Sequence, residues 1–173
     1  MLIVGENLQQ LLSQTALCPP ESYDVNSVTL TLMNVVTEPR QDSTQVTYEH
    51  QDYEDLYVTR TLAPEGLILP PGTSVLGCSH ETVVMPMGYF GQVQTKGSLA
   101  RLFVSTHLND AQVDPGFKGK ITFEITNHGP FEVRIPARSS VAQLYVWKCS
   151  TDNSTPYAGR YQSASGPTVP RLR

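Results

Sequence analysis

Apolar residues recur at helical spacing in one segment near the start of the chain. Within Glu6–Gln14, the side chains of Leu8, Leu11 and Leu12 fall on one helical face, and a proline pair soon afterwards closes the region. The next apolar segment, Ser27–Met33, alternates instead between β-branched, apolar and polar residues, which is typical of a strand. The pattern therefore predicts a short N-terminal helix followed by a strand.

From Leu67 onward the apolar positions come in short runs separated by turn residues such as Pro70-Pro71-Gly72. These runs predict strands at Thr73–Cys78, Thr82–Met85, Tyr89–Thr95, Ile121–Thr126, Phe131–Ile135 and Val141–Trp147. Short strands with turn signals every 8–12 residues or so are typical of an all-β sandwich or barrel. We therefore expect a mainly β fold.

Two segments fall outside this pattern. Glu38–Asp55 is polar and acidic, which predicts an exposed loop, and Ser150–Arg173 is rich in Ser, Pro, Gly and Thr without any periodicity. The second segment reads as a tail that is either disordered or docked on the fold. Neither segment could form a core of its own, so residues 1–173 are expected to form a single domain.

The composition fits a folded domain of a non-membrane protein, with 39% hydrophobic and 16% charged residues. No apolar run approaches the roughly 18 residues that span a bilayer. No Lys or Arg precedes Arg40, so the basic start of a secretory signal is missing and we expect a cytoplasmic protein. Cys18, Cys78 and Cys149 are too far apart in sequence to suggest a disulfide framework or a cysteine zinc site.

Charge is divided unevenly along the chain. Residues 1–95 carry two basic and eleven acidic side chains, whereas residues 96–173 carry ten basic and five acidic ones. The basic half suits a small polyanion such as a nucleoside triphosphate, although an unevenly charged solvated surface explains the pattern equally well. The net charge of −4 makes the chain a poor candidate for binding nucleic acid.

A candidate anion site follows the strand that ends at Thr95. Gly97 and Ser98 lie between two cations, Lys96 and Arg101, so a helical turn starting at Ser98 would direct free N–H groups and a hydroxyl toward an anion. Gly-Ser next to basic residues is also common in ordinary turns, so this motif alone is weak.

Two acidic residues are candidates for chemistry. Asp114 opens the turn Asp114–Gly119, where it either caps the turn or acts on a ligand. Alternation in the predicted strand at 121–126 places Glu124 on a polar face, which either faces solvent or lines a pocket where a carboxylate can move protons. Motifs for zinc deaminases, metalloproteases, P-loops and dinucleotide binding are absent, and His107 stands alone.

Taken in order, these pieces resemble the dCTP deaminase branch of the dUTPase-like superfamily. The resemblance rests on Leu69–Gly72, Val75–Gly77, Glu81, Pro86, Gly97–Arg101, His107, Asp114–Glu124, Gln143-Leu144, Tyr157, Arg160–Gln162 and Gly166–Thr168. It implies a distorted β-barrel or jelly-roll fold with a short N-terminal helix, assembled as a homotrimer with active sites between subunits. The tail at 150–173 is expected to close over a bound deoxypyrimidine nucleoside triphosphate.

The resemblance also implies roles for single residues. Glu124 matches the glutamate that activates water for attack on C4 of cytosine without zinc, and Asp114 matches the aspartate that some members use to cleave dUTP. Lys96, Ser98 and Arg101 match positions that hold a triphosphate accompanied by Mg²⁺. Tyr161 and Gln162 match nucleotide-binding positions in the tail.

Several positions depart from the family pattern. Gly97 replaces a serine whose hydroxyl helps to position the reacting groups, and losing one such donor costs a few kcal/mol of transition-state stabilisation. Lys96 replaces an arginine, so a bidentate phosphate contact becomes a point charge. Two departures fall near the family's binding site for the cytosine base. Gln112 stands where the deaminases have an arginine, and Asp110 stands near a small residue that lines the pocket. Elsewhere, Thr29 replaces an aspartate and Ala164 a glutamine.

Three hypotheses remain open from the sequence. The first is a dCTP deaminase that tolerates Gly97, and the matching Glu124 and tail favour it. The second is a dUTP diphosphatase on the same scaffold, for which Asp114 is the best evidence. The third is a non-catalytic nucleotide-binding regulator, which the substitutions in the pocket favour.

Overall fold

The computed structural model describes residues 1–42, 45–48, 53–151 and 155–171 of the chain. Its first elements are β1 (Leu2–Ile3) and the helix α1 (Gly5–Gln14). Leu8, Leu11 and Leu12 are the buried residues of α1, which confirms the predicted helix and its apolar face. Burying these three leucines against the barrel stabilises a helix that is too short to persist alone in water.

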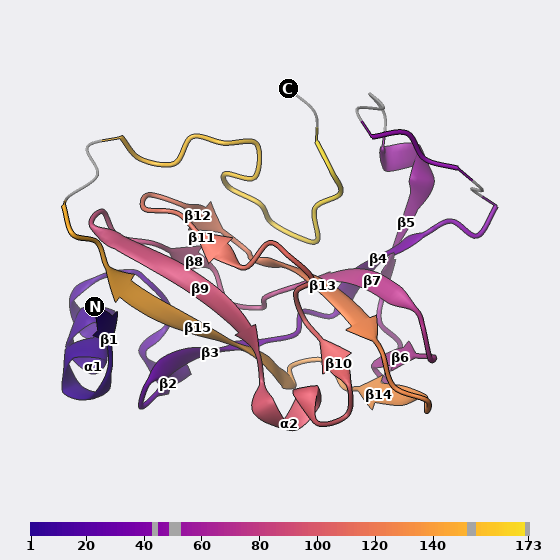
Figure 1. Cartoon of the computed structure of the whole chain (residues 1–173), viewed down its shortest axis with the longest axis horizontal. Helices are drawn as coiled ribbons and strands as arrows, with labels where there is room; N and C mark the ends of the chain where they lie inside the picture. The colour runs from indigo at the N-terminus through magenta and orange to yellow at the C-terminus, as the bar shows by residue number, and fades with distance from the viewer. Residues whose placement is uncertain (43–44, 49–52, 152–154, 172–173) are drawn as a thin grey trace.

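One sheet forms the side of the molecule that α1 packs against (Figure 1). Its strand order is β11-β9-β15-β3-β2, and β1 pairs with β15 beside this path. The strands are β2 (Tyr23–Asp24), β3 (Ser27–Thr31), β9 (Tyr89–Thr95), β11 (Gln112–Val113) and β15 (Ser140–Lys148). The long antiparallel pair β9–β15 runs in register from Thr95 opposite Ala142 to Tyr89 opposite Lys148.

A second sheet has the order β10-β13-β7-β4-β5. Its strands are β4 (Val35–Pro39), β5 (Tyr57–Thr61), β7 (Ser74–Cys78), β10 (Val104–Ser105) and β13 (Thr122–Asn127). Two smaller antiparallel pairs join β8 (Val83–Val84) to β12 (Lys118–Gly119) and β6 (Leu67–Leu69) to β14 (Val133–Ile135). Short helices fill the connections: η1 (Pro20–Ser22), η2 (Glu54–Leu56) and α2 (Gly97–Ala100).

The hydrophobic core lies between the two sheets. Leu30 and Leu144 of the first sheet and Phe123 and Ile125 of the second have no solvent exposure and belong to one buried cluster. The expected mainly β fold is therefore confirmed. Among the described residues, no helix is long and apolar enough to cross a membrane.

The predicted loop at Glu38–Asp55 is wrong at its first residues. Glu38 belongs to β4, which pairs with β5, and its carboxylate accepts a hydrogen bond of 2.6 Å from Arg60. The pair of strands escaped prediction because it buries only Val36 and Thr37, and Thr37 is polar and shares a hydrogen bond of 2.8 Å with Thr59. Residues 43–44 and 49–52 of the predicted loop lie outside the described part of the chain.

Candidate functional site

A cavity of about 520 Å³ is lined by residues of the second sheet, the turns beside it and the C-terminal tail. Strand residues and turn residues from the middle of the chain form its floor, and tail residues form its roof. It is lined by Pro39, Tyr57, Ser74, Val75, Leu76, Leu108, Asp110, Gln112, Val113, Asp114, Phe117, Lys120, Ile121, Thr122, Glu124, Thr126, Tyr157, Tyr161, Ala164, Thr168 and Pro170.

Glu124 enters this cavity from the middle of β13. Phe123 and Ile125, its neighbours in the strand, are fully buried on the core side, so the alternation of the strand turns Glu124 to the other face. One carboxylate oxygen, Oε2, accepts hydrogen bonds from the backbone N–H groups of Leu108 (2.8 Å) and Asn109 (3.4 Å). The loop after β10 thus orients the carboxylate, and of the two alternatives for this polar face the structure has the one in which Glu124 lines a cavity.

Asp114 and Asp110 supply two further carboxyl groups to the cavity lining. Asp114 heads a tight turn in which its carbonyl accepts the N–H of Phe117 at 3.1 Å and Gly116 adopts φ +84°, a conformation that favours glycine. Burial raises the pKa of Asp110, and the negative charges of Glu124 and Asp114 raise it further. The cavity therefore gathers negative charge at this end.

The tail docks on the same turn. The ring of Tyr157 packs against Phe117 with centroids 5.7 Å apart, and its backbone N–H donates to the Pro115 carbonyl at 2.8 Å. Further along, the N–H of Ser163 donates to the carbonyl of Lys118 at 2.7 Å. The tail was expected to be either disordered or docked on the fold. Over residues 155–171, which the structure describes, it is docked.

Tyr161 and Gln162 of the tail were both candidates for nucleotide binding, but their side chains lie in different surroundings. Tyr161 lines the cavity. The side chain of Gln162 instead fastens the tail, because its Oε1 accepts the N–H of Lys118 at 2.8 Å and its Nε2 donates to the Gly116 carbonyl at 3.0 Å.

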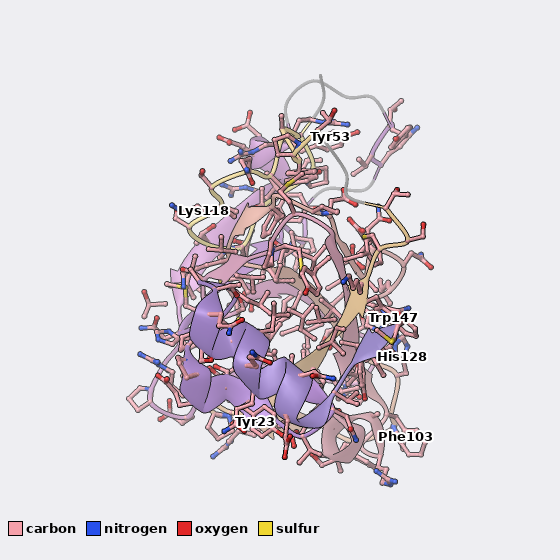
Figure 2. All side chains as sticks on the ribbon, turned by 90° about the vertical axis from the view of Figure 1, so that its left-hand side faces the viewer. Tyr23, Tyr53, Phe103, Lys118, His128 and Trp147 are labelled. Carbon is pink, nitrogen blue, oxygen red and sulfur yellow. The ribbon has the colours of Figure 1, made fainter. Side chains whose placement is uncertain are left out.

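The candidate phosphate motif lies elsewhere in the molecule. Gly97 and Ser98 form the first turn of α2, as expected of a helical turn after Thr95, but α2 lies at the end of the barrel opposite the tail (Figure 1). Figure 2 agrees: Phe103, just after α2, lies far from Lys118 of β12. None of Lys96, Gly97, Ser98 and Arg101 is among the cavity-lining residues.

Both cations of this motif have partners within the chain. Lys96 Nζ donates to Asp24 Oδ2 at 2.7 Å, and the carboxylate also accepts from Gln143 Nε2 at 3.2 Å. The hydrogen bond from Lys96 and its positive charge lower the pKa of Asp24 against a smaller effect of burial. Arg101 Nη1 folds back to the carbonyl of Gly97 at 2.9 Å.

The sequence candidates thus fall into two groups. Asp110, Gln112, Asp114, Glu124 and Tyr161 come together around one cavity. The second group lies at α2 and comprises Lys96, Gly97, Ser98 and Arg101. Gln162 belongs to neither group, because its side chain holds the tail to Lys118 and Gly116. His107 approaches Gln94 Oε1 at 3.4 Å through Nε2, while its buried Nδ1 has no partner among the described residues.

Tyr57, Tyr157 and Lys120 are among the cavity residues to which the sequence assigned no role, although Tyr157 was part of the family resemblance. Tyr57 comes from the unpredicted strand β5, so no pattern pointed to it. Tyr157 belongs to a tail without periodicity. The sequence does carry a signal for Lys120. It is four residues before Glu124, and side chains four residues apart in an extended chain point to the same face.

Comparisons with known proteins identify the family to which this chain is related. The sequence model of the family described as dCTP deaminase-like matches residues 4–149. A "dCTP deaminase, dUMP-forming" of Halobacterium salinarum is 35% identical over 129 residues, which cover 71% of this chain and 66% of that protein. A "dCTP deaminase" of Halorubrum lacusprofundi is 38% identical over 67% of this chain and 60% of its own length. This chain thus spans about two thirds of the length of such relatives.

Solved structures support the fold. The crystal structure of 2'-deoxycytidine 5'-triphosphate deaminase from Agrobacterium tumefaciens superposes with a TM-score of 0.74 at 17% sequence identity. The match covers 87% of this chain and 49% of the other. At that identity the likeness is evidence for the shared barrel, while the sequence matches above carry the family relationship.

Proposed function

The chain belongs to the dCTP deaminase family, and from this premise we propose that it hydrolyses dCTP to dUTP and ammonia. The observation that carries the proposal is the placement of Glu124. Its carboxylate lines the cavity, and two backbone donors hold Oε2. Among the described residues, Oε1 has no hydrogen-bond partner, so it is available to accept a proton from a water molecule.

The proposed reaction adds water across C4 of cytosine. Oε1 of Glu124 takes a proton from the attacking water and delivers it to the ring N3 as the new C–O bond forms. Glu124 then takes the proton of the new C4 hydroxyl group and delivers it to the exocyclic amino group, and the C4–N bond breaks to release ammonia and leave a C4 carbonyl. The sum is one dCTP and one water consumed, and one dUTP and one ammonia formed, with Glu124 restored to its carboxylate.

A second candidate is the further cleavage of dUTP to dUMP and pyrophosphate in the same cavity. Asp114 favours it, since its carboxyl group lines the cavity beside the turn and is available to activate a water molecule. Relatives at 33–36% identity from Halobacterium, Parafrankia and Streptomyces are named as dUMP-forming enzymes, which points in the same direction.

Magnesium enters the proposal with the substrate. Among the described residues there is no group of three or more His, Cys, Asp or Glu side chains that could hold a metal ion. Mg²⁺ is commonly bound through substrate phosphates with few protein ligands. We therefore assign it to the triphosphate, as the Mg–dCTP complex.

The separation of the two candidate groups supports a homotrimer. Within one chain, α2 with Ser98 and Arg101 lies at the opposite end from the tail (Figure 1), and neither residue lines the cavity that Glu124 enters. A second copy that brings its α2 to the mouth of this cavity would complete the site for the triphosphate. Three copies around one axis would then give three equivalent sites.

The test is to incubate the purified protein with Mg²⁺ and either dCTP or dUTP and to separate the products by anion exchange, with the mass in solution measured by light scattering. Conversion of dCTP to dUTP supports deamination, and dUMP from both substrates supports the two-step reaction. Conversion of dUTP alone would move the function to a diphosphatase. A trimer that forms neither product would contradict both candidates and leave the regulatory hypothesis.

A further inference from the structure

Asp110 is a cavity residue to which the reaction above assigns no role. It is also a departure from the family pattern, which has a small residue near this position. In the chain it follows directly on Leu108 and Asn109, whose backbone N–H groups donate to Oε2 of Glu124 at 2.8 and 3.4 Å. The segment that orients Glu124 therefore also brings Asp110 to the cavity.

The carboxyl group of Asp110 lies in the electrostatic surroundings of Glu124. Burial is the main cause of the raised pKa of Asp110, and the negative charges of Glu124 and Asp114 add to it, while a hydrogen bond from the backbone N–H of Gln112 opposes them. Among the described residues, no salt bridge neutralises Asp110. The ionised form is therefore unfavourable for folding, which is typical of a side chain that serves binding rather than stability.

This part of the cavity offers hydrogen-bond acceptors to a ligand. Asp110, Asp114 and Glu124 all belong to its lining. Lys120 also belongs to it, but its ammonium group donates to the carbonyl of His80, which is not a lining residue. Because an ionised carboxylate accepts hydrogen bonds and donates none, these side chains favour a ligand group that carries N–H donors and disfavour one that presents oxygen lone pairs.

The substrate and product of the proposed reaction differ in this respect at C4 of the base. Cytosine carries an amino group, which donates, and uracil carries a carbonyl oxygen, which accepts. The proposed reaction requires Glu124 to exchange protons with N3 and the amino group, so the substituent at C4 lies beside Glu124 and next to the segment 108–110 that holds it. An aspartate carboxylate is a suitable acceptor for the amino group of cytosine.

We propose that Asp110 accepts a hydrogen bond from the amino group at C4 and thereby makes the cavity selective for 4-aminopyrimidine nucleotides over 4-oxopyrimidine nucleotides. The inference rests on the proposed function for the placement of the base beside Glu124. It deepens that function, because a cavity with this preference binds the substrate dCTP more tightly than the product dUTP and so releases the product readily.

The test measures the affinities of two nucleotides by calorimetric titration, the α,β-imido analogues of dCTP and dUTP. The imido bridge blocks cleavage to the monophosphate, and every protein in the test carries Glu124→Gln, so that the cytosine analogue is not deaminated. The quantity compared is the ratio of cytosine to uracil affinity. Adding Asp110→Ala should lower this ratio roughly tenfold, as expected for the loss of one charge-assisted hydrogen bond.

Two matched variants sharpen the comparison. Asp110→Asn preserves the shape of the side chain, but its amide group also donates to a carbonyl oxygen, so it should lower the ratio at least as far as Asp110→Ala. Because it removes an unfavourable charge, it should remain folded, and misfolding cannot explain the loss of preference. Asn109→Ala changes the exposed neighbour, which is not a lining residue, and should leave the ratio within about twofold.

The outcomes separate this inference from the proposed function, because the titrations do not depend on turnover. If the unsubstituted protein deaminates dCTP but neither Asp110 variant changes the ratio, the inference is wrong while the function stands. If the ratio falls with both Asp110 variants and the unsubstituted protein releases no ammonia from dCTP, the recognition stands and the proposed function is wrong. An equal fall in the ratio with Asn109→Ala would also overturn the inference.

Discussion

At the scale of single residues, Gly97 is the departure with the clearest chemical consequence. A Cβ atom at this position would lie 3.2 Å from Nη1 of Arg101, the far end of a flexible side chain, so the site can accept a larger residue after a small shift. Gly97→Ser adds a hydroxyl group at a position where preorganised donors stabilise transition states. We expect its dCTP turnover to exceed that of the parent by roughly tenfold.

Gly97→Ala is the matched control for this prediction. It places the same Cβ against Arg101 but adds no hydroxyl group, so steady-state kinetics should show no gain in kcat. A gain of equal size in the alanine variant would attribute the effect to Arg101, and no gain in either variant would refute a role for the missing hydroxyl.

Asp110 gives a pH-dependent prediction. Because burial and Glu124 raise its pKa, the folded state binds a proton more readily than the unfolded chain, and the ionised group costs stability at neutral pH. Asp110→Asn should therefore raise Tm at pH 7. The gain should shrink as the pH falls through the raised pKa and vanish below the unfolded-state value of about 3.9.

Asp24→Asn is the opposite case, measured in the same thermal scans. Lys96 lowers the pKa of Asp24, so this carboxylate stabilises the fold above the unfolded-state pKa, and the contribution disappears as the pH falls through the lowered value. This variant should lose stability at pH 7, by less than about 1 kcal/mol for so exposed a pair. Shifts of the same sign in both variants would contradict these assignments.

At the scale of elements, Asn127 joins the end of β13 to its surroundings. Its fully buried amide donates to the carbonyls of Leu69 (2.9 Å) and Phe131 (2.8 Å) and accepts the N–H of Gly129 (2.9 Å). Asn127→Ala leaves these backbone groups unsatisfied and should lower the free energy of unfolding by about 3 kcal/mol in urea titration. Exposed Asn109→Ala should change it by less than about 0.5 kcal/mol.

The tail is the second element with a separable role. It covers the cavity through Tyr157, Tyr161 and Thr168, and its two tyrosines pack against a buried hydrophobic cluster that itself ends at Val146. Deleting residues 150–173 should therefore lower the urea midpoint without abolishing the cooperative transition, and it should weaken dCTP binding about tenfold or more because ordered contacts over the ligand are lost. Calorimetric titration checks the affinity, and unchanged affinity would remove the tail from the site.

Elements also show which features the sequence could reveal. The alternation around Glu124 predicted its strand and its polar face, because Phe123 and Ile125 must turn inward for burial. The strands β4 and β5 escaped because only Val36 and Thr37 of the pair are buried, and cross-strand hydrogen bonds such as Thr37 with Thr59 and Glu38 with Arg60 join the rest. Hydrophobic periodicity carries no signal for pairing of that kind.

At the scale of the whole molecule, sequence order is a poor guide to which candidates meet. Lys96–Arg101 and Asp114–Glu124 are close in sequence, but the chain passes through α2 and β10 at one end of the barrel before it returns to the cavity. Conversely, Tyr157 and Phe117 are 40 residues apart in the numbering and in contact. These distances depend on the closure of both sheets, which no local pattern encodes.

The measurement that tests the central claim most directly is ammonia release from Mg–dCTP by the parent protein and by Glu124→Gln, side by side. Glutamine preserves the shape of the side chain and keeps an acceptor for the N–H groups of Leu108 and Asn109, but it cannot take a proton from water. We predict steady ammonia release by the parent and a loss of at least about a thousandfold in the variant, with both proteins at the same mass in solution. Equal rates in the two proteins, or no ammonia from the parent, would contradict the account.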